Sequence, residues 1–147
     1  MILPDDFSEF LRSLNAHDVK YLVVGGHAVS FHGYPRFTHD VDVVVLPDAA
    51  NVRALLAALA DFGFAEVGLD VSDFLKPTTV VLGRAPDQID IMTFIKGVDV
   101  NEAWQRRIPG VLDGTDVAFI SRQDLITNKR AVGRPEDLAD IARLGDE

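Results

Sequence analysis

The sequence YLVVGGHAVSFHGYPRFTHDVDVVVL, residues 21–46, begins and ends with an apolar run. The first run, Tyr21–Val24, stops at a glycine pair, and the second, Val43–Leu46, has no polar alternation, which is typical of buried strands. Between them, residues 27–32 lack helix breakers and place apolar side chains on one helical face, and residues 33–35 end that pattern. The stretch therefore predicts a strand, a glycine turn, a short helix, a loop and a second strand.

Two aspartates, Asp40 and Asp42, precede the second apolar run. Side chains two residues apart on a strand share a face and lie roughly 7 Å apart along it, so these carboxylates can converge on one site. Two carboxylates at the open end of a buried strand need a compensating cation, and a divalent metal ion with oxygen ligands is the simplest one. The alternative is that Asp40 caps the strand and Asp42 lies on a solvated face. The unbroken apolar run after Asp42 favours the metal site.

The glycine pair Gly25-Gly26 lies between the first strand and the short helix. Glycine permits a tight turn and lets a ligand approach the backbone without interference from a Cβ atom. The free N–H groups at the start of the following helix suit a phosphate. A plain structural turn is the alternative, and the nearby carboxylates favour the phosphate site.

Taken together, these features resemble a known family. The order Gly-Gly, HAVSFHG, Arg36-Phe37-Thr38 and Asp40-Val41-Asp42 resembles the minimal nucleotidyltransferases of the DNA polymerase β superfamily, and above all their AbiEii-type branch. The resemblance is specific over residues 24–44, weaker in the middle of the chain, and returns in DLITNKRAVGRPEDLADIARL, residues 124–144. It implies an α/β (α+β) fold of the polymerase-β-like type, with a mixed twisted sheet and helices packed mainly on one side.

The resemblance also implies a third carboxylate on a neighbouring strand. Asp90, in the apolar setting Ile89-Asp90-Ile91, fits that position best, and Asp87 in the preceding turn is the second choice. Asp40, Asp42 and Asp90 are then the catalytic residues and the ligands of the metal ions. Without the resemblance, Asp90 is equally well explained as a polar residue on an edge strand.

Nucleotide binding is assigned by the same resemblance to Gly25, Gly26, Arg36, Thr38 and Lys129. On its own, Lys129 would be an ordinary exposed helical lysine, but its position matches the late lysine of the family, which reaches the nucleotide phosphates. Arg36 is the competing phosphate ligand.

The end of the C-terminal motif departs from the family pattern at one position. Arg134 and Asp137 fit the motif, whereas Glu136 stands where a basic residue is common. His27 also follows the glycine pair where many nucleotidyltransferases have serine. These two differences weaken the expected phosphate contacts of their side chains.

The implied activity is transfer of an NMP group from an NTP to an acceptor hydroxyl with Mg²⁺ or Mn²⁺. The acceptor would be a tRNA, a protein or a small molecule, and the setting a toxin-antitoxin or phage-defence system. The alternative is a catalytically silent nucleotide-binding or antitoxin-like partner protein, and either could form a homo-oligomer or bind a cognate partner. Neither GxGxxG nor GxxxxGK[ST] occurs, which disfavours dinucleotide and P-loop chemistry.

Composition sets broad limits on the class of protein. The 147 residues fit one domain, 1–147, with C-terminal helices at about 121–145 packed on it. The absence of cysteine excludes disulfides and thiolate metal sites, and with no expected membrane span it indicates a cytoplasmic protein. The net charge of −9 disfavours unassisted binding to long nucleic acid. No histidine pair has the spacing of a zinc helix motif.

The remaining elements follow from hydrophobic periodicity and turn residues. We expect helices at residues 5–16, 47–61, 98–107, 122–131 and 135–144, and strands at 64–71, 75–82, 88–94, 111–112 and 117–120.

Overall fold

The computed structural model describes residues 5–33, 38, 40–64, 69–84 and 87–145. Its strands are β1 (Tyr21–Val24), β2 (Val41–Val45), β3 (Thr79–Arg84), β4 (Asp87–Met92), β5 (Ile108–Leu112) and β6 (Thr115–Phe119). Its helices are α1 (Asp5–Ala16), α2 (Gly25–Phe31), α3 (Ala49–Leu59), the π-helix η1 (Ala60–Phe64), α4 (Val71–Phe74), α5 (Val100–Gln105), α6 (Arg122–Val132) and α7 (Pro135–Arg143). None of the helices in these ranges is long enough and apolar enough to cross a membrane.

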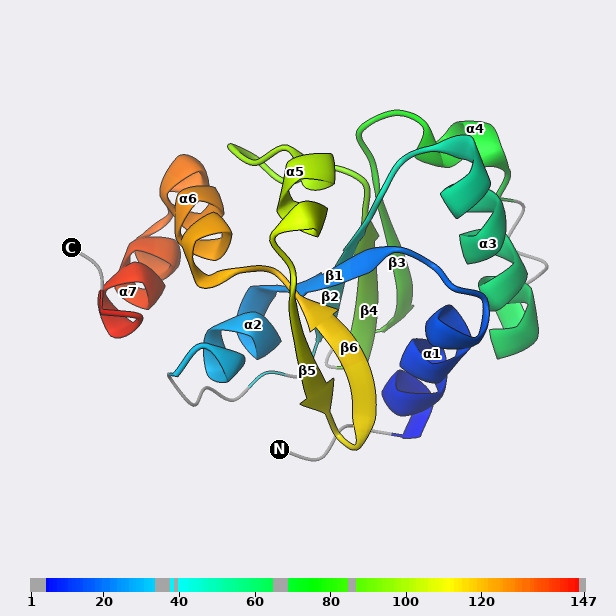
Figure 1. Cartoon of the computed structure of the whole chain (residues 1–147), viewed down its shortest axis with the longest axis horizontal. Helices are drawn as coiled ribbons and strands as arrows, with labels where there is room; N and C mark the ends of the chain where they lie inside the picture. The colour runs from blue at the N-terminus through cyan, green and yellow to red at the C-terminus, as the bar shows by residue number, and fades with distance from the viewer. Residues whose placement is uncertain (1–4, 34–37, 39, 65–68, 85–86, 146–147) are drawn as a thin grey trace.

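The six strands form one mixed sheet in the order β3-β4-β2-β1-β6-β5 (Figure 1). β1 and β2 pair antiparallel, whereas β2 pairs parallel with β4 and β1 parallel with β6. The outer pairs β3–β4 and β5–β6 are antiparallel. The strand after the aspartate pair is therefore central in the sheet, as its apolar sequence predicts.

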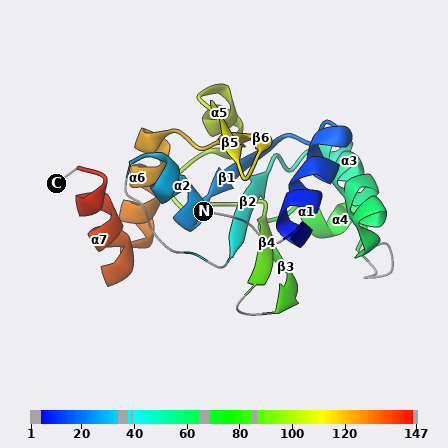
Figure 2. The same cartoon turned by 90° about the horizontal axis from the view of Figure 1, so that it is seen from below.

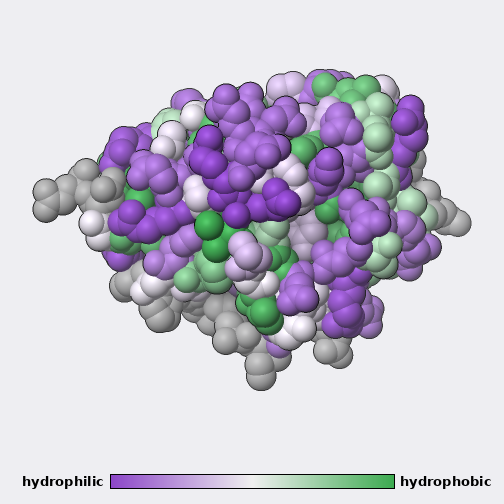
Figure 3. Space-filling model, in the orientation of Figure 1, coloured by the Kyte–Doolittle hydropathy of each residue, from purple (hydrophilic) through white to green (hydrophobic). Residues whose placement is uncertain are grey.

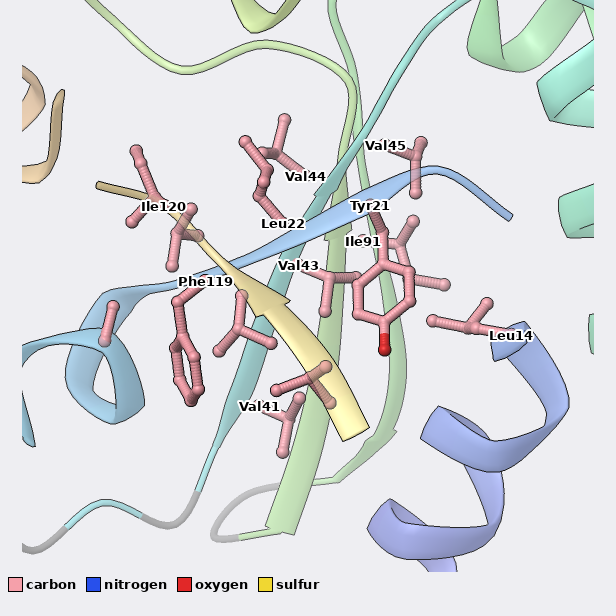
Figure 4. Packing of buried hydrophobic residues seen from close by; sticks show 14 of the residues in the cluster. Leu14, Tyr21, Leu22, Val41, Val43, Val44, Val45, Ile91, Phe119 and Ile120 are labelled. Atoms are coloured by element: carbon pink, nitrogen blue, oxygen red, sulfur yellow. The ribbon is translucent and has the colours of Figure 1, made fainter. Parts of the chain in front are cut away.

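Alternating side chains of the central strands pack on both faces of the sheet. In Figure 4, Leu22 and Val44 extend to one side of β1 and β2, whereas Val43 and Ile91 extend to the other, where Leu14 of α1 approaches. All five side chains are fully buried. Burial on both faces explains why this segment lacks polar alternation beyond Asp42.

Apart from α5, which lies between them in both views, the main helices lie in two groups (Figures 1 and 2). α2, α6 and α7 lie beyond the end of β1, whereas α1, α3 and α4 lie near its beginning. The mixed sheet that we expected is confirmed, whereas packing of the helices mainly on one of its faces stays a prediction. The face of Figure 1 is mainly hydrophilic, with hydrophobic atoms near its centre (Figure 3).

Most of the expected elements are confirmed. Of the strand expected at 64–71, residues 65–68 lie outside the described residues, and the two ends that are described belong to helices, Phe64 to η1 and Val71 to α4. Asp70 caps helix α4: its side chain accepts a hydrogen bond from the N–H of Ser72, and Asp73 accepts one from the N–H of Asp70 at 2.7 Å. This reciprocal cap starts a helix at Val71. The next strand is also shorter than expected, because β3 begins at Thr79 and not at residue 75.

Candidate active site

Asp42 and Asp90 lie side by side on the two neighbouring strands β2 and β4. They are directly opposite each other in the parallel register, so their side chains point to the same face of the sheet. The two carboxyl groups are in hydrogen-bonding contact, and both line a cavity of about 480 Å³. The sheet register therefore brings together two residues that are 48 positions apart in the sequence.

The environment of Asp42 disfavours its ionised form. Burial, the hydrogen bond to Asp90 and the charges of Asp90 and Asp40 raise the pKa of Asp42 to about 7, while the positive charge of Lys129 opposes this rise. Near neutral pH the pair must therefore share a proton or bind a cation.

Gly25 packs directly against this carboxylate pair. It has a φ of +68°, and a Cβ atom there would overlap Asp42 Oδ2 and lie 2.9 Å from Asp42 Cγ. Any other residue would be both strained and in collision with the carboxylate. The glycine is therefore required by the position of Asp42, whatever it binds.

Gly26 makes the second close approach of the turn. A Cβ atom at Gly26 would lie 3.0 Å from Thr38 Cβ, and the hydroxyl of Thr38 donates a hydrogen bond to the carbonyl of Asp40 at 3.3 Å. The turn thus touches the segment that leads into β2. The binding of a phosphate by Gly25, Gly26 and Thr38 stays a prediction.

Asp40 lies apart from the Asp42–Asp90 pair. Its Oδ1 accepts a hydrogen bond from the backbone N–H of Gln88 at 3.4 Å, and the Gln88 side chain donates to Asp90 Oδ1 at 3.0 Å. Gln88 therefore links the first aspartate to the third. Among the residues described, no group of three or more His, Asp or Glu side chains is already arranged around a metal position.

Lys129 lies at the same cavity, but it is not the exposed lysine that we expected. Its side chain is buried, and Nζ lies 3.0 Å from Asp140 Oδ2 and 3.5 Å from Asp137 Oδ1. The reason is the left-handed turn at Gly133, after which α7 folds back on α6 and presents the two aspartates, three residues apart, on one helical face. The charge of Lys129 is already compensated within the protein.

Arg134 is the more accessible cation at the cavity. Its guanidinium binds Asp137 through Nε at 2.7 Å and Nη2 at 3.3 Å, yet 62% of its side chain is exposed. Burial opposes ionisation of Asp137, but Arg134 and Lys129 together lower the pKa of that carboxyl. From the sequence, Arg134 was expected to fit the C-terminal motif, but no phosphate-binding role was assigned to it.

A second accessible cation, Lys96, was missed from the sequence. It is exposed, lines the cavity, and follows Asp90 by six residues, in a turn beyond the end of β4. The position of a lysine just beyond a carboxylate-bearing strand is the signal that could have identified it. Arg36 and His39 lie outside the described residues.

Two other features are not part of this cavity. His27 is buried, burial lowers its pKa, and its Nε2 has no partner in the described structure. A larger hollow of about 690 Å³ lies beside Trp104 and Tyr21, but Asp116 is the single carboxylate in its described lining. A carboxylate pair is found in the 480 Å³ cavity, which is therefore the candidate active site.

Paired carboxylates on central strands, a glycine turn packed against them and cations from the C-terminal helices are the features expected of a nucleotidyltransferase. The chain belongs to the family described as "Nucleotidyltransferase of unknown function (DUF6036)", whose model matches residues 5–144. A comparison with curated proteins finds no match. The family match thus supports the expectation that the chain is a nucleotidyltransferase. Membership of the AbiEii-type branch stays a prediction.

The pKa of Asp42 predicts a specific pH dependence of stability. Because the folded-state pKa of about 7 exceeds the ordinary value of 3.8, folding free energy is lost as the pH rises from about 4 through 7. Asp42→Asn removes the carboxyl group whose ionisation causes this loss, and the amide of the new side chain can still donate a hydrogen bond to Asp90. We expect the variant to be more stable than wild type by roughly 2 kcal/mol at about pH 8 and equal to it near pH 4. Urea denaturation across this range measures the difference, and a pH-independent difference would contradict the assignment.

Burial of Lys129 predicts a structural cost for its removal. Lys129→Ala leaves Asp137 and Asp140 buried with less compensation, so we expect a loss of about 3 kcal/mol in urea denaturation. Lys96→Ala, which removes an exposed lysine from the same cavity, is the matched control and should change stability by less than about 0.5 kcal/mol. Equal stability of Lys129→Ala and wild type would show that the ion pairs do not hold the helices together.

Proposed function

We propose that the protein is a metal-dependent nucleotidyltransferase that moves an NMP group from an NTP to an acceptor hydroxyl. Family membership supports a transferase with a nucleoside triphosphate substrate. The observation that carries the finer proposal is the contact between the Asp42 and Asp90 carboxyl groups in a cavity that also contains basic side chains. Such a site combines metal ligands with groups that bind a polyphosphate.

The donor set of the cavity fits a hard divalent cation. The contacting pair offers oxygen ligands whose joint ionisation is disfavoured until positive charge is supplied. Asp42 and Asp90 would hold Mg²⁺ or Mn²⁺, and Asp40, which immediately precedes β2, would complete the set. When bound, the ion would neutralise the carboxylates and polarise the α-phosphate.

The chain's own residues have distinct roles in this proposal. Arg134 and Lys96 bind the β- and γ-phosphates, because both are accessible cations of the cavity. Asp90 orients the acceptor hydroxyl and accepts its proton. The acceptor oxygen then bonds to the α-phosphorus, the bond from that phosphorus to the bridging oxygen breaks, and pyrophosphate leaves.

Lys129 has an indirect role in this scheme. Its ion pairs with Asp137 and Asp140 fix α7 against α6, and its charge opposes the rise in the pKa of Asp42. Phosphate binding therefore passes from Lys129 mainly to Arg134, which Asp137 holds at the cavity.

Metal-linked nucleotide binding is the first test of this function. We expect Mg²⁺ plus ATP to raise the melting temperature by several degrees, and ATP in chelated buffer to raise it much less, because the carboxylate pair repels a triphosphate until it is neutralised. Differential scanning fluorimetry measures both shifts. Equal shifts with and without metal would contradict the metal site.

Transfer itself is tested by incubation with each α-labelled NTP, Mg²⁺ and candidate tRNA, protein or small-molecule acceptors. We expect Asp90→Asn to lower the transfer rate by roughly 10³-fold or more, because the variant loses both a metal ligand and the proton acceptor. Asp116→Asn, an exposed carboxylate on β6, is the matched control and should retain wild-type activity. Transfer by Asp90→Asn at the wild-type rate would exclude Asp90 from the mechanism.

A further inference from the structure

The cavity has an apolar wall that metal binding and phosphate binding do not use. Met92, Phe94, Ile95 and Val132 contribute to its lining. Phe94 is 53% exposed and Val132 is 38% exposed. Other apolar side chains of the protein are also exposed, but these two lie in the lining of the cavity that holds the carboxylate pair. Exposed apolar side chains gathered in a polar cavity need a ligand with an apolar surface.

Phe94 lies on the same side of its chain segment as Asp90. Burial alternates along this segment: Ile91 and Thr93 are buried, whereas Asp90, Met92 and Phe94 are partly or largely exposed and line the cavity. β4 ends at Met92, and Phe94 follows two residues later in irregular chain. The aromatic ring therefore lies in the same cavity as the carboxylates, but beyond the end of the strand that carries Asp90.

The backbone around Phe94 is fixed on both sides. The N–H of Thr93 donates to the carbonyl of Thr78 at 3.1 Å, and its hydroxyl donates to the carbonyl of Lys76 at 2.8 Å. On the other side, Ile95 is buried and pairs with Val98 in an isolated bridge. A ring that is exposed on a rigid backbone is a preformed binding surface.

The turn that follows Phe94 is also held against α6. The side chain of Asn128 donates to the carbonyl of Lys96 at 2.9 Å, and a Cβ atom at Gly97 would lie 2.6 Å from Ala131 Cβ. This close contact places Val132, the last residue of α6, in the lining of the same cavity. The end of β4 with the segment after it and the end of α6 thus both contribute apolar side chains to the cavity.

We propose that Phe94 is the platform on which the nucleobase of the bound NTP stacks, with Val132 contributing to the same apolar wall. This inference rests on the proposed function and adds the base-binding residue to it. Every base has a π-face, so the platform contributes affinity for any of the four NTPs without choosing among them. In this arrangement, the phosphates occupy the polar part of the cavity at Arg134 and Lys96. The base occupies the apolar part at Phe94.

Calorimetric titration of ATP and of tripolyphosphate, each with Mg²⁺, separates base binding from phosphate binding. We expect Phe94→Ala to weaken ATP binding about tenfold and to leave tripolyphosphate binding unchanged, because tripolyphosphate has no base. Phe94→Tyr keeps the ring and should bind ATP like wild type. Leu75→Ala removes an exposed apolar side chain that is not in the described cavity lining and is the matched control.

The possible failures are distinguishable. If wild type binds ATP and Phe94→Ala binds it equally well, the platform is wrong while the proposed function stands. If Phe94→Ala weakens ATP and tripolyphosphate to the same extent, Phe94 maintains the shape of the cavity and does not stack on the base. If wild type binds neither ATP nor tripolyphosphate, the proposed function fails, and the platform fails with it.

Discussion

Contact between the carboxyl groups of Asp42 and Asp90 is the constraint on which the candidate site depends. The parallel pairing of β2 with β4 puts them opposite each other in a partly buried position, where two negative charges are unfavourable. Gly25 packs against Asp42, and its missing Cβ atom leaves the space that this carboxylate occupies. The unfavourable interaction between the two carboxylates must be offset by a proton or a cation, and a cation is the partner that the proposed nucleotidyl transfer would use.

The C-terminal helices supply positive charge to this site through a network of ion pairs. Lys129 is buried between Asp137 and Asp140, and Arg134 is held on Asp137 with its outer part exposed. One carboxylate thus serves both the buried lysine, which packs α7 on α6, and the accessible arginine, which can meet a ligand. Stability of the helix pair and presentation of a cation are coupled in this arrangement.

Sequence reasoning was strongest where structure follows from neighbouring residues. Tyr21–Val24 was predicted with its observed bounds. The helix predicted at 122–131 is α6, and the side chain of Ser121 caps it by accepting the N–H of Asp124. Sequence reasoning failed at the described ends of the strand expected at 64–71, where Phe64 belongs to η1 and the Asp70 cap starts a helix at Val71. The pairing of Asp42 with Asp90 and the burial of Lys129 depend on strand register and on the return of α7, which no local pattern determines.

A structure of the protein with Mn²⁺ and a non-hydrolysable NTP analogue, with anomalous scattering recorded at the manganese edge, tests the central claim most directly. The account predicts an anomalous peak that contacts both the Asp42 and Asp90 carboxylates, with the triphosphate beside it. A bound nucleotide without an ion at these two carboxylates, or a manganese ion elsewhere in the molecule, would contradict it.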